Sequence, residues 1–598
     1  MMKTQKKSRV ILHRHLRQLA TLCGLTLLST MVSAQQLEVP ADVLASQAKR
    51  VAAIKKASAS TVMVFANEGK GGGSGVLISP DGYALSNYHV VQPAGTAMKC
   101  AINDGELYDA ILVSIDPVGD VALIKLLGRD DFPYAKLEDS DQVRVGDWCF
   151  AVGNPFLLAT DFNPTVTYGI VSGVHRYQYP AGTLLEYADC IQTDASINPG
   201  NSGGPLYNEN GDLIGINGRG SFEKRGRVNV GVGYAISINQ IKHFMGFLHS
   251  GRILDHATLG ATVSTDEKGG VIVTNISESS DAFRRGLRYG DQLLSFGGRN
   301  ITTVNGFKNV LGIYPRGWRV PLSFLHEGER IDTFVRLTGV HSPEELLARV
   351  QPNRQQRPAP MPDSEDPEKP EEPMQPKPAK PASPELPAVV QPFYAARRGF
   401  ANFHFNRLNQ NRVWDAYSQQ TKPETAKGDW LLRGKLGNLG DATITLTKTR
   451  VDAELPQGKA FAVLDNDLGQ QESPRGSGGL LVALHLWKHI QQTGITQFGD
   501  VYYLGSMPTP KHKEKQDVLV ATHSVIECRF YFSPSTGLLT SMEMFPDLGV
   551  DPCEIYFSEY ESVNGRMLPR RLEIHHGDTV YGELNIEDFE FNIGERTE

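Results

Sequence analysis

The sequence contains little cysteine for its length. Only six of its 598 residues are cysteines, and one of them, Cys23, lies in an apolar segment near the N-terminus. The remaining five are an odd number, so at least one is unpaired within a monomer, and so few in so long a chain exclude a disulfide-rich scaffold. We therefore expect the fold to depend on the packing of apolar side chains. The five are Cys100, Cys149, Cys190, Cys528 and Cys553.

Excess positive charge, long apolar runs and metal-ligand spacings are also missing. The formal net charge is −7, so nothing indicates a nucleic-acid partner. After the N-terminus no stretch is apolar over the length that a bilayer requires. We predict neither a cofactor nor a metal, because several histidines and cysteines of the C-terminal part lack the spacing of metal ligands. These residues are His404, His512, His575, His576, Cys528 and Cys553.

The N-terminus has the pattern of an export signal. A basic stretch from Lys3 to Arg17 precedes an apolar segment from Leu19 to Val32, and small residues follow at Ser33 and Ala34. This order is typical of a cleaved signal peptide, which we place at residues 1–34. We therefore expect an exported protein of the periplasm or cell envelope. An uncleaved N-terminal membrane anchor is the alternative.

The length predicts three or four domains. After an N-terminal segment at 35–57, residues 58–250 alternate short β-type runs with Gly, Asn and Asp turns, and a helix is expected at 237–248. Many short strands at regular spacing predict an all-β barrel or sandwich. Residues 255–340 have a pattern of strands with short helices around 281–285 and 304–310.

The composition changes abruptly after this second unit. Residues 341–392 include a stretch rich in proline, glutamate and lysine, which cannot bury enough apolar surface to fold. We predict a disordered linker there. Residues 393–598 return to a globular composition, with helices expected at 394–408 and 480–492 and strand-like runs near the end. An α+β domain with an antiparallel sheet is the prediction for this part.

Ser202 has the surroundings of a catalytic nucleophile. Glycines stand at positions 200, 203 and 204, and they allow the tight backbone that exposes a serine Oγ and directs N–H groups at an oxyanion. The N–H groups of Gly200 and Ser202 are the expected oxyanion donors. The string also satisfies the Gly-x-Ser-x-Gly pattern of α/β-hydrolases, so its context has to decide between the two classes.

His89 and Asp120 complete a candidate triad. His89 follows a strand-like run, where an imidazole can serve as general base, and Asp120 stands in a turn before a buried strand, where its carboxylate can orient that imidazole. An α/β-hydrolase would place its acid and its histidine after the serine. Here both precede Ser202 in β-type sequence, which favours a chymotrypsin-like protease over an esterase.

Five motifs together resemble the HtrA (Deg) family of serine proteases. The resemblance implies two perpendicular six-stranded barrels with the triad in the cleft between them. It also implies an ATP-independent endopeptidase, a homotrimer or larger oligomer, that degrades unfolded or damaged exported proteins. The motifs follow the family order: Gly73-Ser74-Gly75-Val76-Leu77-Ile78, Ser86-Asn87-Tyr88-His89-Val90, Asp120-Val121-Ala122-Leu123, Gly153-Asn154-Pro155-Phe156 and Gly200-Asn201-Ser202-Gly203-Gly204-Pro205.

The residues expected around the S1 pocket carry no charge. Ser196 stands six residues before the nucleophile, where trypsin-like enzymes that cut after lysine or arginine have an aspartate. Ile214, Gly215 and Ile216 form the expected wall strand. We therefore predict that small or medium-sized apolar side chains precede the cleaved bond.

The second unit resembles the PDZ domains appended to HtrA proteases. In that fold a strand edge beside the loop of Leu259, Gly260 and Ala261 accepts a peptide C-terminus as an added strand. A PDZ fold that only packs against the protease is the alternative. The resemblance rests on Leu259-Gly260-Ala261, Gly270-Val271-Ile272-Val273, Ala282, Gly286-Leu287, Gly290-Asp291-Gln292-Leu293-Leu294 and Gly298.

The last domain shows a fainter similarity to the lipoprotein-carrier half-barrel of the LolA and RseB type. It rests on Asp551-Pro552-Cys553, Glu559-Tyr560 and residues 569–574, and an adaptor for substrates or partners is the alternative. For the whole chain we predict an exported serine endopeptidase. A catalytically latent, chaperone-like or peptide-binding scaffold in envelope protein quality control is the second hypothesis, and an esterase is the third.

Overall fold

The computed structural model describes most of the chain after residue 38. The chain divides into two compact units, Met1–Ala53 and Ile54–Glu598, and the domains below belong to the second. The predicted signal peptide lies outside the described residues. These are 39–65, 72–154, 161–178, 186–222, 229–350, 386–423, 427–464 and 467–592, with only the backbone described at 219–222 and 229–230.

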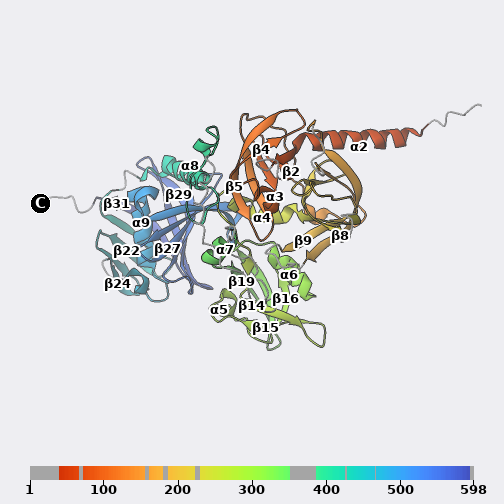
Figure 1. The fold of residues 1–598 in the computed structure, drawn as a ribbon. Helices are drawn as coiled ribbons and strands as arrows, with labels where there is room; N and C mark the ends of the chain where they lie inside the picture. Colours follow the sequence, from red (N-terminus) through yellow and green to blue (C-terminus); the bar gives the residue numbers. More distant parts are fainter. Residues whose placement is uncertain are drawn as a thin grey trace, which may run out of the picture. The chain divides into compact units, whose positions relative to one another are not determined.

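The first barrel follows helix α2, Ala41–Ser60, and is a closed sheet in the order β1-β2-β3-β6-β5-β4 (Figure 1). Its apolar residues alternate with the strand period and meet in one core, which includes Val62, Leu77 and Ile124. The short helix α3, Tyr88–Val91, follows β3. The strands are β1 Thr61–Phe65, β2 Gly72–Leu77, β3 Tyr83–Ser86, β4 Ala97–Ala101, β5 Leu107–Asp116 and β6 Val121–Leu126.

The second barrel is closed in the order β10-β11-β12-β9-β8-β7. Helix α4, Ile238–Leu248, leaves it after β12. The two barrels confirm the predicted chymotrypsin-like double six-stranded fold. The strands are β7 Trp148–Gly153, β8 Thr165–Gln178, β9 Tyr187–Thr193, β10 Pro205–Asn208, β11 Leu213–Phe222 and β12 Asn229–Ser237.

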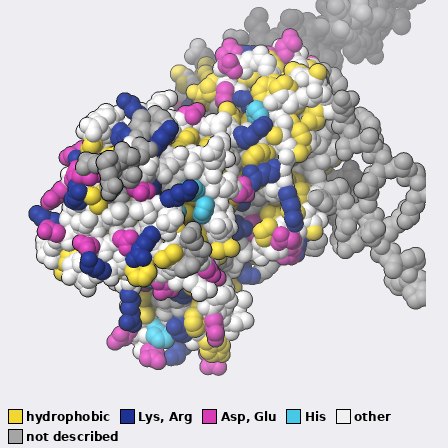
Figure 2. All heavy atoms as spheres, turned by 90° about the vertical axis from the view of Figure 1, so that its left-hand side faces the viewer, with side chains coloured by type: hydrophobic (Ala, Val, Ile, Leu, Met, Phe, Trp, Pro, Cys, Tyr) yellow, Lys and Arg dark blue, Asp and Glu magenta, His cyan; other side chains and the backbone are white. Residues whose placement is uncertain are grey.

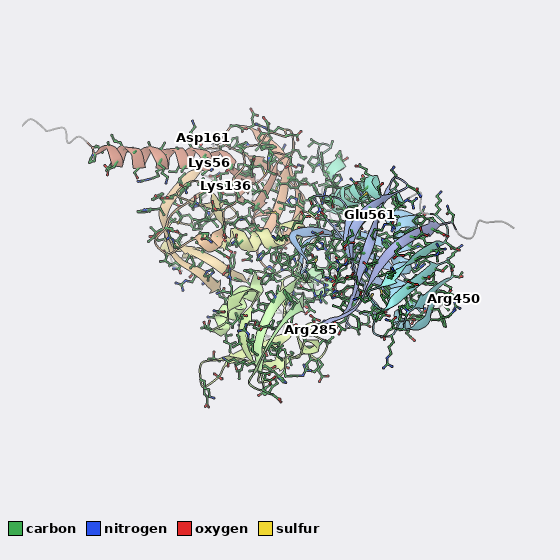
Figure 3. All side chains as sticks on the ribbon, turned by 180° about the vertical axis from the view of Figure 1, so that it is seen from behind. Lys56, Lys136, Asp161, Arg285, Arg450 and Glu561 are labelled. Atoms are coloured by element: carbon green, nitrogen blue, oxygen red, sulfur yellow. The ribbon has the colours of Figure 1, made fainter. Side chains whose placement is uncertain are left out.

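The last turns of α2 are fastened to the second barrel. Lys56 and Lys136 both reach the carboxylate of Asp212, at 2.7 and 3.2 Å (Figure 3 labels the two lysines). The hydroxyls of Ser60 and Tyr207, both buried, lie 2.8 Å apart. The helix therefore extends into the region where the protease domain was expected to begin.

The PDZ domain, which follows the two barrels, is built around a sheet in the order β14-β15-β16-β18-β19. Helix α5, Asp281–Arg284, begins at Ser280, whose hydroxyl accepts a hydrogen bond from Phe283 N, and α6 is Val304–Gly312. The strands are β13 Ala257–Thr258, β14 Ala261–Thr265, β15 Val271–Ile276, β16 Gln292–Phe296, β17 Arg299–Asn300, β18 Arg319–His326, β19 Glu329–Arg336 and β20 Thr338–Gly339.

The C-terminal domain is built on one 11-stranded antiparallel sheet, in the order β24-β23-β22-β21-β31-β30-β29-β28-β27-β26-β25, with helices α8, Phe403–Thr421, and α9, Leu480–Gln497. Its strands are β21 Trp430–Leu436, β22 Gly440–Leu446, β23 Arg450–Leu455, β24 Gly458–Val463, β25 Asp500–Thr509, β26 His512–His523, β27 Ile526–Phe532, β28 Leu539–Phe545, β29 Cys553–Val563, β30 Arg566–His576 and β31 Thr579–Phe591.

Helix α9 packs inside this sheet. Trp487 lies at 5.5 Å, between ring centroids, from Trp430 of β21 and at 5.2 Å from Phe557 of β29, while His489 lies 4.7 Å from His523 of β26. The helix therefore touches strands from well-separated places in the sheet order, and its apolar residues share a single core with them. Burial on all sides explains why the first five residues of the helix, Leu480–Leu484, are apolar all round.

Two elements differ from the sequence-based expectation. The predicted linker contains helix α7, Pro343–Val350, which Ser342 caps by accepting a hydrogen bond from Glu345 N at 3.1 Å. Proline in the first turn after a serine is a helix start signal that the overall composition concealed. The helix expected at 394–408 begins only at Phe403, because Asn402 caps it.

The C-terminal domain contacts the protease and PDZ domains through buried polar groups. Asn406, 0% exposed, donates to Ser250 O and Tyr503 O at 2.7 and 2.8 Å. Arg319 of β18 lies 2.9 Å from Glu554, and Arg285, labelled in Figure 3, lies 3.0 Å from Asp578.

On the face drawn in Figure 2, basic and acidic side chains are interspersed.

Candidate active site

The strand pairing of the first barrel brings His89 and Asp120 together. β3 pairs antiparallel with β6, with Ser86 opposite Ala122, so the end of one strand meets the start of the other. His89 follows β3 and Asp120 precedes β6. As a result, His89 Nδ1 lies 2.7 Å from Asp120 Oδ2, and His89 N donates to Asp120 Oδ1 at 3.0 Å. The carboxylate can thus fix both the position and the tautomer of the imidazole.

Asp120 is fully buried and has a left-handed backbone, with φ 58°. That conformation is costly for a residue other than glycine. It is stabilised at the carbonyl oxygen, which accepts from Asn87 Nδ2 at 2.8 Å and from Tyr88 N at 3.3 Å. The Tyr187 hydroxyl donates to Asp120 Oδ2 at 2.5 Å. Tyr187 lies on β9 of the other barrel and has no local motif, so its role is not predicted from the sequence.

The His89 imidazole is partly open to solvent, with 40% of the side chain exposed. Burial of the remainder disfavours the imidazolium, but the hydrogen bond to Asp120 and its negative charge outweigh this effect and raise the pKa of His89 above its usual 6.5. A basic imidazole that solvent can reach suits a general base.

Ser202 lies in the turn between β9 and β10 and is held against the first barrel. Ser74 N donates to Ser202 O at 2.9 Å. Ser202 packs so closely on the first barrel that Gly73 has no room for a side chain. A methyl group on Gly73 would lie 2.9 Å from Ser202 O and 2.8 Å from Cγ2 of Val90, the residue after His89. The structure thus brings the three predicted triad residues to one place. Within the described residues Ser202 Oγ donates to Gly218 O, at 3.5 Å, and has no hydrogen bond to His89.

The backbone around Ser202 resembles an oxyanion site. Gly200 has φ 106°, and Ser74 Oγ donates to its carbonyl oxygen at 2.7 Å, which fixes the peptide plane. In the part of the chain that the structure describes, the N–H groups of Gly200 and Ser202 have no hydrogen-bond acceptor. Two unoccupied donors beside a serine hydroxyl are what a developing oxyanion requires.

The predicted S1 residues occupy two different environments. Ser196 is exposed, and its carbonyl accepts from Thr167 Oγ1 at 2.9 Å. Ile214 and Ile216 are fully buried, and Ile214 belongs to the core of the second barrel. Farther along β11, Gly218 is the residue whose carbonyl meets Ser202 Oγ. The S1 assignment stays a prediction, and the structure adds Gly218 as a strand residue beside the nucleophile.

The predicted peptide-binding loop precedes the edge of the PDZ sheet. Leu259 is buried, and Gly260 has φ 74°, with its carbonyl accepting from Ser277 N at 2.8 Å. Strand β14 follows and is the outermost strand of the described sheet order. Helix α6 is fixed to the protease by Asn309, which accepts from Asp189 N at 2.9 Å and donates to His175 O at 2.7 Å.

Among the described residues, no cluster of three or more His, Cys, Asp or Glu side chains could hold a metal ion. No helix in the described part is long and apolar enough to span a membrane. The five cysteines named above are all buried and unpaired.

Comparison with protein families matches both predicted domain types. Residues 73–216 match the trypsin-like peptidase domain, and residues 257–337 match the PDZ domain. The periplasmic serine endoprotease DegP of Escherichia coli (strain K12) is 37% identical over 278 residues, which are 44% of this chain and 56% of DegP. A DegP-like periplasmic serine endoprotease of Chlamydia trachomatis is 34% identical over 301 residues, 47% of this chain and 57% of that protein.

These two matched domains are therefore similar in sequence to those of DegP-type periplasmic serine endoproteases. The matched residues span little more than half the length of these curated relatives. Among solved structures, an HtrA-type protease AlgW with tripeptide has a TM-score of 0.41 at 30% identity and covers 49% of this chain and 98% of its own. A serine endoprotease from Yersinia pestis has a TM-score of 0.37 at 29% identity and covers 51% of this chain and 100% of its own.

Proposed function

We propose that the protein is a serine endopeptidase in which Ser202 is the nucleophile, His89 the general base and Asp120 the residue that orients and stabilises the imidazole. The observation that carries this proposal is the buried Asp120 carboxylate, 2.7 Å from His89 Nδ1, in the same barrel whose Ser74 N holds the Ser202 carbonyl at 2.9 Å. Ser202 Oγ would attack the peptide carbonyl while His89 accepts its proton. The N–H groups of Gly200 and Ser202 would bind the oxyanion.

The proposed substrates are unfolded or damaged proteins of the periplasm or cell envelope. DegP of Escherichia coli is named a periplasmic serine endoprotease, which supports the compartment predicted from the N-terminal signal pattern. The open edge of β14 supports capture of an extended peptide, and its C-terminus is the proposed ligand of the Leu259–Ala261 loop. Assembly as a homotrimer or larger oligomer remains part of the proposal.

The orientation of Ser202 favours a second candidate, a latent protease that acts as a peptide-binding scaffold until it is activated. Its hydroxyl donates to Gly218 O rather than to His89. Catalytic hydrogen bonds are often long in the free enzyme and tighten only when substrate binds.

A fluorophosphonate, which reacts with activated serines, separates these candidates. Labelling of the full-length protein that disappears in Ser202→Ala supports an assembled site, whereas no labelling of either protein contradicts the proposed endopeptidase and supports the latent scaffold. Hydrolysis of a denatured protein and not of a short-chain ester then distinguishes a peptidase from an esterase.

A further inference from the structure

A second buried histidine–aspartate pair, His256 and Asp116, contacts the turn that carries Asp120. His256 immediately precedes β13, the first strand of the PDZ unit, and is 2% exposed. Its Nε2 lies 2.8 Å from Oδ2 of Asp116, the last residue of β5, which is 1% exposed. The pair therefore connects the start of the PDZ domain to the barrel that holds His89.

Asp116 shapes the turn that leads to Asp120. While Oδ2 faces His256, Oδ1 accepts hydrogen bonds from Val118 N at 3.1 Å and Gly119 N at 2.8 Å. The turn leaves no space around this pair: a methyl group on Gly119 would lie 2.4 Å from Asp116 Oδ2 and 2.7 Å from His256 Nε2. Asp120, with its left-handed backbone, is the next residue, so a shift of the pair moves the carboxylate that orients His89.

On the PDZ side, the backbone and the ring face of His256 are held, while its Nδ1 is buried without a hydrogen-bond partner among the described residues. His256 O accepts from Val340 N at 3.0 Å, beside the pairing of β13 with β20. The His256 ring stacks on Phe244 of α4 with centroids 4.6 Å apart. The preceding residue, Asp255, accepts from His341 N and pairs with His341 Nδ1, at 2.9 and 2.8 Å. The position of the imidazole therefore depends on the pairing of β13 with β20, the first and last strands of the PDZ unit.

The charges that face His256 are negative. They are Asp116 at the end of β5, Glu186 before β9, whose N–H donates to Val118 O at 3.0 Å, and the adjacent Asp255. Burial disfavours the imidazolium, but the charge and hydrogen bond of Asp116, helped by Glu186 and Asp255, raise the pKa of His256 above its usual value. The contribution of the charged pair is thus complete at low pH and is lost as the pH rises through this raised pKa.

We propose that His256 is a positioning residue for Asp120, and that the catalytic aspartate is held in its working geometry through the path His256–Asp116–Gly119. The proposal rests on the proposed endopeptidase function and deepens it, because it makes the seating of the PDZ unit a condition for an ordered triad. It assigns His256 no contact with substrate.

The test compares His256→Ala, which leaves the Asp116 carboxylate buried without its partner, with His256→Gln, which keeps an N–H donor but not the charge. We expect His256→Ala to lower kcat by about 10- to 100-fold, because small misplacements of catalytic groups have effects of this size, with KM unchanged. His256→Gln should retain most activity near neutral pH. In the natural protein we expect kcat to decline above neutral pH as His256 loses its proton. In His256→Gln this decline should be absent.

His326→Gln is the matched control, because His326 also pairs with a buried aspartate, Asp291, at 2.8 Å, within the PDZ unit. Rates are normalised to the folded fraction measured by circular dichroism, so that misfolded protein does not count. If kcat per folded molecule and the pH profile of both His256 variants equal those of His326→Gln, the pair is only structural and the proposal is wrong.

A second readout separates this proposal from the failure of the endopeptidase proposal. The hydrogen bond between His89 Nδ1 and Asp120 should give a strongly deshielded proton resonance in the natural protein and in His326→Gln, even if no substrate is cleaved. We expect His256→Ala to shift or abolish this resonance. An unchanged resonance in His256→Ala would overturn the positioning role independently of any activity.

Discussion

At the residue scale, the site depends on how many groups hold Asp120. Its carboxylate is bound by His89 through two nitrogens and by Tyr187, and its carbonyl by Asn87 and Tyr88. Burying a carboxylate is unfavourable unless each oxygen is well satisfied. The activity should therefore respond to residues that never touch the substrate.

Tyr187→Phe removes one donor from Asp120 Oδ2 without changing the packing. We expect kcat to fall by about 10- to 150-fold, the equivalent of a buried hydrogen bond to a charged group, about 1.5–3 kcal/mol, with KM unchanged. Tyr207→Phe is the control, since Tyr207 is a buried tyrosine of the same barrel that bonds Ser60 instead. Steady-state kinetics on a peptide substrate measure the effect, and equal kcat values in the two variants would exclude a role for Tyr187.

The pH dependence follows from the raised pKa of His89. Only the neutral imidazole accepts a proton, so kcat/KM should rise with pH through a value above 6.5. Asp120→Asn removes the charge that raises this pKa. The acid limb should move to lower pH, and the rate should fall by about 10⁴-fold, as it does for the same change in another Ser–His–Asp protease. An acid limb that stays in place in Asp120→Asn would contradict this electrostatic account.

At the element scale, local patterns predicted a β-rich region at residues 58–250 and located helices α4, α5, α6 and α9, because turn glycines and apolar periodicity are local signals. The motifs also singled out His89, Asp120 and Ser202 as the candidate triad, since each has recognisable flanking residues. Tyr187 and His256 escaped prediction because their partners are on another barrel or domain. Helix α7 was hidden by the proline-rich composition around it.

Helix α9 should dominate the stability of the C-terminal domain. Trp487 is 1% exposed and contacts aromatic side chains of two strands. We expect Trp487→Ala to destabilise this domain by about 3–5 kcal/mol through the cavity that it leaves, measured as a lower transition temperature in calorimetry. Val525→Ala is the control, because Val525 is 73% exposed. A transition as stable as that of the control would show that α9 is not part of the core.

At the scale of the whole molecule, the C-terminal domain is docked on the protease rather than carried on a free tether. A methyl group on Gly246 of α4 would lie 2.1 Å from Ser506 Oγ and 2.4 Å from Ser506 N in β25. Gly246→Leu should therefore cost about 1–3 kcal/mol or more of docking free energy, and small-angle scattering should report a larger radius of gyration. Gly306→Leu, on α6, should leave the radius unchanged. Equal radii for both variants would contradict the docked arrangement.

The central claim is that Ser202, activated by His89 and Asp120, cleaves peptide bonds. Degradation of β-casein by the chain from Gln35 onward, measured beside Ser202→Ala, tests it most directly. We predict that the natural sequence produces fragments and that the variant produces none. Degradation by both proteins, or intact casein with both in the presence of a peptide ligand for the PDZ domain, would contradict the claim.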